Sequence, residues 1–178
     1  ELEFRMSRIN RQDKVLAFTV KSLPAETVIC ADAPVYGDDD IKVGFAQLSE
    51  FMRDNHITIT KAMGIRHSII TNTDRFVWAL QVKNMNFQRI NTDHGWELTR
   101  HQFSPQMVAS AVIRGSFAQS LPCTNGFEAW ANFHNYALIG ASREVYIRLV
   151  DNDIDHPDNL MEIQYPIRMM TSTEAMNR

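Results

Sequence analysis

The chain has 178 residues, of which 44% are hydrophobic and 10% aromatic, enough to bury the core of one compact domain. Its formal net charge of −3 argues against direct nucleic-acid binding, because phosphate neutralisation needs a local excess of Lys and Arg. The only cysteines, Cys30 and Cys123, are far apart and form no CxxC pair, which predicts neither a disulfide framework nor a thiolate zinc site. No apolar run approaches the ~20 residues that span a bilayer, so we expect a soluble cytoplasmic protein that does not contact membranes.

The first predicted elements begin after an N-terminal extension, residues 1–13, in which the residues before Met6 are typical of expression-vector sequence. A β-rich run at 26–31 predicts a strand. The acidic run Asp38-Asp39-Asp40 then offers an N-cap for a helix over 41–55, whose apolar stripe is Ile41, Phe45, Leu48 and Met52. Two further strands are predicted at 65–70 and 76–82, separated by a polar turn at 71–74.

The second half of the chain repeats this order of elements. A strand is predicted at 108–113, a helix at 125–137, and two strands near 144–150 and 161–167. Residues 169–178 are expected to form a C-terminal tail. Each half thus reads as one βαββ unit.

An offset of 82 residues relates the two halves and indicates a duplication. The matching positions are Gly44-Phe45 with Gly126-Phe127, Leu48 with Trp130, Phe51 with Phe133, Ile57 with Ile139, and Ile65-Arg66 with Ile147-Arg148. The segments after Pro24 and Pro105 match with the register moved by one residue. The sequence therefore predicts an α+β domain over 14–168, with repeats at about 14–90 and 96–168. We expect antiparallel sheets, helices on the outside and a ligand groove at the pseudo-twofold seam.

The two copies differ in chemistry on the strand that contains Glu144 and Tyr146. Alternation places these two residues on one face, while Val145, Ile147 and Leu149 share the other, which we expect to pack on the helix. The equivalent positions of the first copy hold the small residues Ala62 and Gly64. A partly desolvated carboxylate beside aromatic rings suits an organic cation. The alternative is an ordinary surface salt bridge with Arg143, Arg148 or Arg66.

Aromatic residues supply the other candidate contacts. Phe45 and Phe127 lie in the first turns of the two helices, and Trp130 and Phe133 continue the second helical stripe, a pattern that is also typical of a core. Trp78 shares a strand face with Phe76 and could form a stacking wall. Trp96 lies between the repeats, where it would close the groove or cover its rim.

The chain resembles the GyrI-like effector-binding domains, which occur at the C-terminal end of AraC-type and MerR-type bacterial regulators and as free-standing proteins. The resemblance covers roughly residues 14–168 and depends on the order and spacing of several motifs. They are the duplicated βαββ plan, the helix starts Gly44-Phe45-Ala46-Gln47-Leu48 and Gly126-Phe127-Glu128-Ala129-Trp130, the strand Glu144-Val145-Tyr146, and the closing strand 162–167.

The resemblance implies a pocket that binds cationic, lipophilic drug-like molecules and has a role in drug sensing or sequestration. The residue at the position of Glu144 would lie at the bottom of this pocket, with those at Tyr146 and Phe45 lining it. The sequence shows no DNA-binding helices, so transcriptional activity does not carry over from the resemblance.

Motifs for metals and catalysis are weak, and we expect neither a cofactor nor an enzyme. The six histidines form no HExxH motif, and no GxSxG or Gly-rich phosphate loop occurs. The acidic residues at 151, 153, 155 and 162 fit calcium-loop spacing, but His156 stands where the loop needs Gly, so an acidic hairpin loop is predicted. Two alternatives remain open: a small-molecule hydrolase using Glu144 and Tyr146, and a protein that inhibits a larger enzyme such as gyrase.

Overall fold

The computed structural model describes residues 17–33, 38–66, 76–83, 87–116, 118 and 123–171. The strands are β1 (Thr19–Leu23), β2 (Glu26–Ala33), β3 (Ile59–Arg66), β4 (Phe76–Val82), β5 (Arg89–Asn91), β6 (Glu97–Phe103), β7 (Gln106–Arg114), β8 (Tyr136–Leu138), β9 (Ser142–Arg148) and β10 (Leu160–Met169). The helices are α1 (Asp38–Asp54) and α3 (Cys123–Phe133). The predicted turn at 71–74 and residues 67–70 of the predicted strand 65–70 lie outside the described residues.

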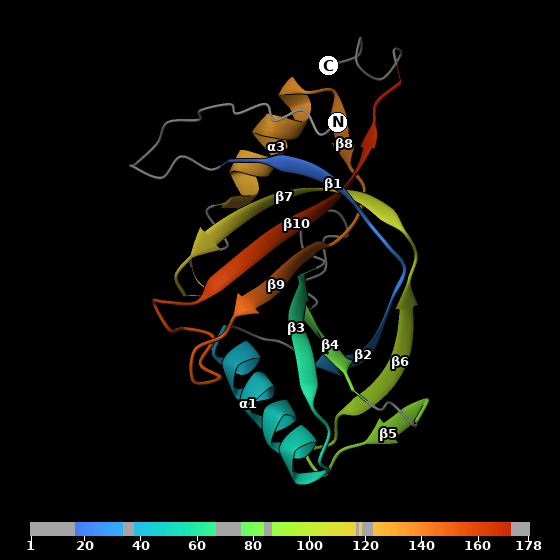
Figure 1. Ribbon diagram of the computed structural model, residues 1–178, viewed down its shortest axis with the longest axis vertical. Helices are drawn as coiled ribbons and strands as arrows, with labels where there is room; N and C mark the ends of the chain where they lie inside the picture. The colour runs from blue at the N-terminus through green and yellow to red at the C-terminus, as the bar shows by residue number, and fades with distance from the viewer. Residues whose placement is uncertain are drawn as a thin grey trace.

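The strands form one curved sheet in the order β1-β7-β10-β9-β3-β4-β2-β6-β5, and β8 pairs with the end of β10 (Figure 1). Every neighbouring pair is antiparallel. One unit is β2-α1-β3-β4 and the other is β7-α3-β9-β10, and they meet where β3 pairs with β9. The α+β prediction from two βαββ units is therefore confirmed.

The pseudo-twofold relation is visible in the register of the β3–β9 pair. Met63 lies opposite Val145, and these positions are themselves 82 apart, so the local axis passes through this pair. Ala62 lies opposite Tyr146 and Gly64 opposite Glu144, as the repeat requires. The two units are therefore joined along one continuous strand pair, and Glu144 lies beside that junction.

The one-residue shift between the copies lies in a different strand from the one we predicted. Trp78 pairs with both Gly64 and Ala31 in the first unit. Met161 occupies the matching place in the second unit, where it pairs with Tyr146 and Ile113. The offset is thus 82 between β2 and β7 and between β3 and β9, but 83 between β4 and β10. An irregularity in the pairing of β9 with β10, between Leu160 and Met161, accompanies this shift.

Strands β1 and β6 were not predicted, and they exchange between the units. β1 precedes the first unit but pairs with β7, whereas β6 precedes the second unit but pairs with β2. Their sequences, TVKSL and ELTRHQF, contain few apolar residues and therefore give a weak strand signal. The strand that precedes each unit therefore pairs with the first strand of the other unit.

Helix α1 buries the predicted stripe and ends in a Schellman motif. Ile41, Phe45, Leu48 and Met52 are all at most 2% exposed. His56 adopts a left-handed φ of 56°, and the amide of Ile57 donates to the Met52 carbonyl at 2.8 Å. The helix face toward the sheet is thus set by sequence periodicity.

Both helices cover the same face of the sheet, as the duplication predicts. Phe45 of α1 contacts Trp78, with ring centroids 4.6 Å apart, and Phe127 of α3 contacts Tyr165 at 4.7 Å. Our prediction of which β9 face meets the helices is wrong, because Tyr146 packs with the helix-side core while Val145 belongs to a separate cluster on the opposite face. Strand alternation defines two faces, but it does not say which of them a helix covers.

Two smaller expectations also have an outcome. Phe133 continues the helical stripe in sequence, yet this last residue of α3 is 78% exposed. The acidic segment between β9 and β10 is a loop, as predicted, and Lys42 of α1 contacts Asp155 at 3.0 Å. Among the described helices, none has the length and apolar character needed to cross a membrane.

Candidate ligand-binding site

Four of the six predicted site residues meet on the helix-covered face, close to the junction of the two units. Glu144 and Tyr146 come from β9, Trp78 from β4 and Phe45 from α1. The rings form a continuous series, with Trp78 lying 4.6 Å from Phe45 and 6.1 Å from Tyr146 between centroids. Phe76, at 5.0 Å from Trp78, adds a fourth ring. These residues are all at most 6% exposed, so the site is closed by its own side chains.

Small residues on β3 provide the space that these rings occupy. Ala62 and Gly64 are the cross-strand partners of Tyr146 and Glu144. A Cβ atom at position 64 would collide with the Phe76 ring and lie 3.6 Å from Glu144 Oε2. Glycine at this position therefore lets the tip of the Phe76 ring approach the strand beside the carboxylate.

Glu144 is a buried carboxylate whose cationic neighbour is Arg66. Its side chain is 4% exposed, and Arg66 Nε lies 3.8 Å from Oε1. The guanidinium carbon of Arg66 also lies 5.7 Å from the centroid of Phe76, within cation–π distance. The ion pair we considered as the alternative thus exists, but its carboxylate is buried rather than solvated.

The other two candidate arginine partners are directed elsewhere. Arg143, next in sequence to Glu144, lies on the opposite face of the sheet, and Arg148 donates to the carbonyl of Asp158. Arg66 is therefore the cation that the fold selects for Glu144.

Tyr146 contributes a buried hydroxyl next to this carboxylate. Its residue is 6% exposed, and no described residue accepts from or donates to Oη. Burial raises the pKa of the phenol well above its ordinary value, and the negative charge of Glu144 raises that pKa further. The indole Nε1 of Trp78 also has no hydrogen-bond partner among the described residues. Two buried donors therefore lie in the aromatic cluster without a hydrogen bond to any described residue.

The remaining two predicted residues lie outside this cluster. Phe127 is fully buried in the equivalent part of the second unit, against Phe18 and Tyr165. Trp96 directly precedes β6 and packs against α1, where its Nε1 donates to Gln47 Oε1 at 3.1 Å and its ring leaves no room for a side chain at Gly44. The sequence did not predict which arginine pairs with Glu144, because Arg66, Arg143 and Arg148 were all possible partners.

The chemistry of this arrangement is suited to binding a cation. A buried carboxylate offers charge, and the surrounding rings offer apolar surface and negative faces. Among the described residues, no three His, Cys, Asp or Glu side chains come together as a metal site.

Comparison with known proteins identifies the fold. No protein-family model matches the chain, and no curated protein matches it in sequence. The C-terminal domain of EcmrR is 17% identical and has a TM-score of 0.69, with 88% of this chain and 100% of that domain covered. The match to the EcmrR chain in its complex with DNA covers 58% of that protein. A hydrolase from Listeria innocua is 8% identical with a TM-score of 0.52, covering 85% of this chain and 91% of that one.

These structures share the duplicated α+β architecture of the present chain. The chain thus has the fold of the GyrI-like effector-binding domains, as its motifs predict. The chain spans less than two thirds of EcmrR, and the likeness concerns the fold.

Proposed function

We propose that this domain is a ligand-binding module for lipophilic organic cations, with Glu144 as the counter-charge. The observation that supports this proposal most directly is the buried Glu144 carboxylate beside the rings of Phe76, Trp78 and Tyr146. Water is largely excluded around this carboxylate, so its attraction for a cation is stronger than on the surface.

The aromatic rings favour a delocalised cation over a small hydrated one. An ammonium or metal ion would have to give up its hydration shell, whereas an aryl-substituted cation is weakly hydrated and gains from ring contacts. The indole and phenol donors of Trp78 and Tyr146 can serve polar substituents of such a ligand. The charge and the apolar surface thus select together for an aromatic cation.

Arg66 occupies a position similar to the one expected for a ligand cation. It contacts Glu144 and lies above the Phe76 ring, which are the two contacts that an aromatic cation would make. Its side chain is 19% exposed, so it reaches the carboxylate from the solvent side. Ligand entry therefore requires Arg66 to withdraw, and the ring series to open.

The test uses three probes of similar shape: tetraphenylarsonium, tetraphenylborate and neutral triphenylphosphine oxide. Calorimetric titration of the full chain should show preference for the cation. Glu144→Gln preserves size but removes the charge, so cation affinity should fall by about 1.5–3 kcal/mol, roughly 10- to 150-fold. Glu128→Gln, an exposed change on α3, removes the same charge elsewhere and should leave affinity within about twofold.

Equal binding of all three probes, or unchanged cation affinity in Glu144→Gln, would contradict the proposal. Mass spectrometry of an ester-bearing cationic dye after long incubation with the protein distinguishes binding from hydrolysis. Binding predicts that the dye is recovered intact. Turnover that Glu144→Gln abolishes would instead establish an enzyme.

A further inference from the structure

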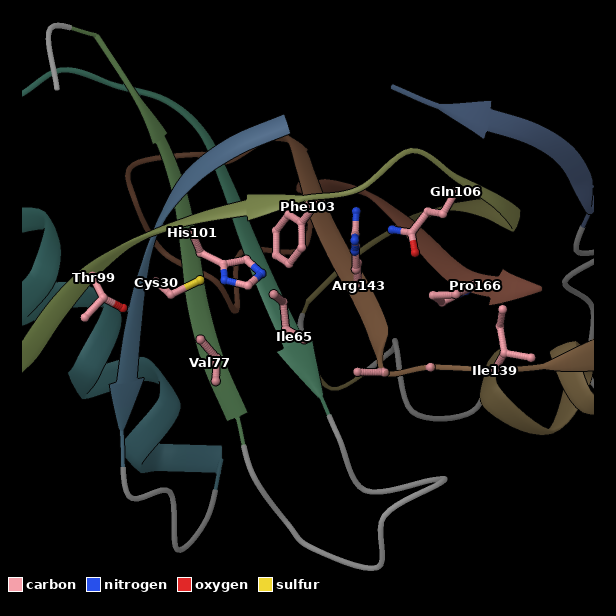
Figure 2. A pocket seen from close by; sticks show the side chains of 12 residues that line it. Cys30, Ile65, Val77, Thr99, His101, Phe103, Gln106, Ile139, Arg143 and Pro166 are labelled. Atoms are coloured by element: carbon pink, nitrogen blue, oxygen red, sulfur yellow. The ribbon is translucent and has the colours of Figure 1, made fainter. Parts of the chain in front are cut away.

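The opposite face of the sheet contains a pocket, of about 430 Å³, that is separate from the cation site (Figure 2). It is bounded by Cys30 of β2, His101 and Phe103 of β6, Arg143 of β9 and Pro166 of β10. Neither α1 nor α3 contributes a residue to its lining. This volume is within the range of small-molecule sites.

Arg143 is the charged group of this pocket, and it is almost fully buried. The residue is 6% exposed, and its guanidinium carbon lies 4.1 Å from the centroid of the Phe103 ring. When the side-chain oxygen of the Gln106 amide faces the guanidinium, it accepts hydrogen bonds from both Nη atoms of Arg143, at 2.9 Å from Nη1. Figure 2 shows the guanidinium held between Phe103 and Gln106. A flat cation is thus fixed at the pocket wall by stacking and by a neutral acceptor.

The charges around the guanidinium leave it a net cation. Desolvation lowers the pKa of Arg143, and the nearby negative charge of Glu26 acts in the opposite direction, while arginine stays protonated in proteins. Glu26 itself forms an ion pair with Lys61. Within the described ranges, no carboxylate oxygen lies within 4.0 Å of the Arg143 guanidinium. Buried arginines are normally matched by an anion.

We propose that this pocket binds a small organic carboxylate with an apolar or aromatic body, through Arg143. A carboxylate matches the two parallel donors of a guanidinium, which the neutral Gln106 amide can satisfy only in part. Ile65, Val77 and Ile139 line the rest of the pocket and would contact the apolar body. The site is independent of the cation site, since the side chains of Arg143 and Glu144 leave β9 on opposite faces.

The test titrates the full chain with 2-naphthoate, 2-naphthamide and 2-naphthylmethylammonium. Naphthoate should bind at least about tenfold more tightly than the other two, the usual advantage of a charge-assisted contact. Arg143→Gln should lower naphthoate affinity by about tenfold or more, whereas the exposed control Arg100→Gln should stay within about twofold. Affinity of Arg143→Gln for tetraphenylarsonium should stay within about threefold, because that probe is proposed to bind at Glu144.

A second measurement uses the unmodified protein. Cys30 lines the pocket, so naphthoate should slow its alkylation by the neutral reagent iodoacetamide, and tetraphenylarsonium should not. Equal affinity for naphthoate and naphthamide, or alkylation of Cys30 at the same rate with saturating naphthoate, would overturn the anion site. Loss of naphthoate binding in Glu144→Gln would show that both probes share one site. Failure of tetraphenylarsonium to bind would contradict only the proposed cation function.

Discussion

Arg143 and Glu144 are consecutive residues of one strand, yet they belong to two unlike environments. Glu144 points into the helix-covered face, where Phe45, Trp78 and Tyr146 fill the surrounding space. Arg143 points to the helix-free face, where Phe103 supports it beside an open pocket. The pleat of a single strand has therefore separated two opposite charges by the thickness of a sheet. The carboxylate lies in a closed aromatic cluster, and the guanidinium lies beside an open pocket.

The same comparison extends to the two units. The pseudo-twofold axis gives every position on β9 an equivalent on β3, but the equivalents of Glu144 and Tyr146 are Ala62 and Gly64. A symmetric pair of carboxylates at this junction would repel each other in a buried setting. One carboxylate opposite a glycine instead leaves a single charged site with room beside it.

The largest expected effect is a loss of free energy of unfolding that differs between the two faces of the sheet, because their packing differs. Trp78 and Val77 are neighbours on β4 and point to opposite faces. Trp78→Ala should lower the free energy of unfolding by about 3–5 kcal/mol, because it leaves a cavity within the closed ring series. Val77→Ala should cost about 1–2 kcal/mol, since the space it vacates adjoins an existing pocket. Urea unfolding of both variants measures this, and equal losses would remove the contrast between the faces.

The second prediction concerns Arg66, the protein's own cation that pairs with Glu144 on the helix-covered face. Arg66→Gln removes the competitor of a cationic ligand, so affinity for tetraphenylarsonium should rise by about tenfold, or 1.4 kcal/mol. Affinity for naphthoate on the other face should not change. Titration beside Arg53→Gln, an exposed change on α1, measures the effect. A fall in cation affinity would show that Arg66 supports the site rather than blocking it.

The smallest effect concerns the buried phenol, and it appears only at alkaline pH. The pKa of Tyr146 is raised in the folded state, so the unfolded phenol ionises first and stability falls as pH rises above 10.0. Below that pH the folded state keeps this contribution in full. Tyr146→Phe cannot ionise, so it should lose less stability than the parent between pH ~8 and ~11. At neutral pH it should differ by about 0.5 kcal/mol or less, because the hydroxyl has no described partner.

Urea unfolding at a series of pH values provides this test. Parallel alkaline profiles of Tyr146→Phe and the parent would show that the phenol is hydrated rather than buried in the ring series. That result would also weaken the view of the helix-covered face as closed.

The repeat and its local patterns were readable from the sequence alone. The 82-residue offset identified Ala62 and Gly64 as the equivalents of Glu144 and Tyr146, whereas the pairing of Met63 with Val145 was decided by the tertiary structure. The apolar stripe of α1 follows from helical periodicity, and the common face of Glu144 and Tyr146 follows from strand alternation. The helical stripe and the strand alternation depend on residues close together in the chain, and the repeat depends on residue types that recur along it.

Tertiary structure alone decided which parts of the chain lie against each other. The exchange of β1 and β6 between units, the side of β9 that the helices cover, and the choice of Arg66 over two other arginines all depend on contacts between distant segments. The pocket at Arg143 arises in the same way, from strands β2, β6, β9 and β10. Periodicity tells which side chains share a face, but the path of the whole chain determines what that face meets.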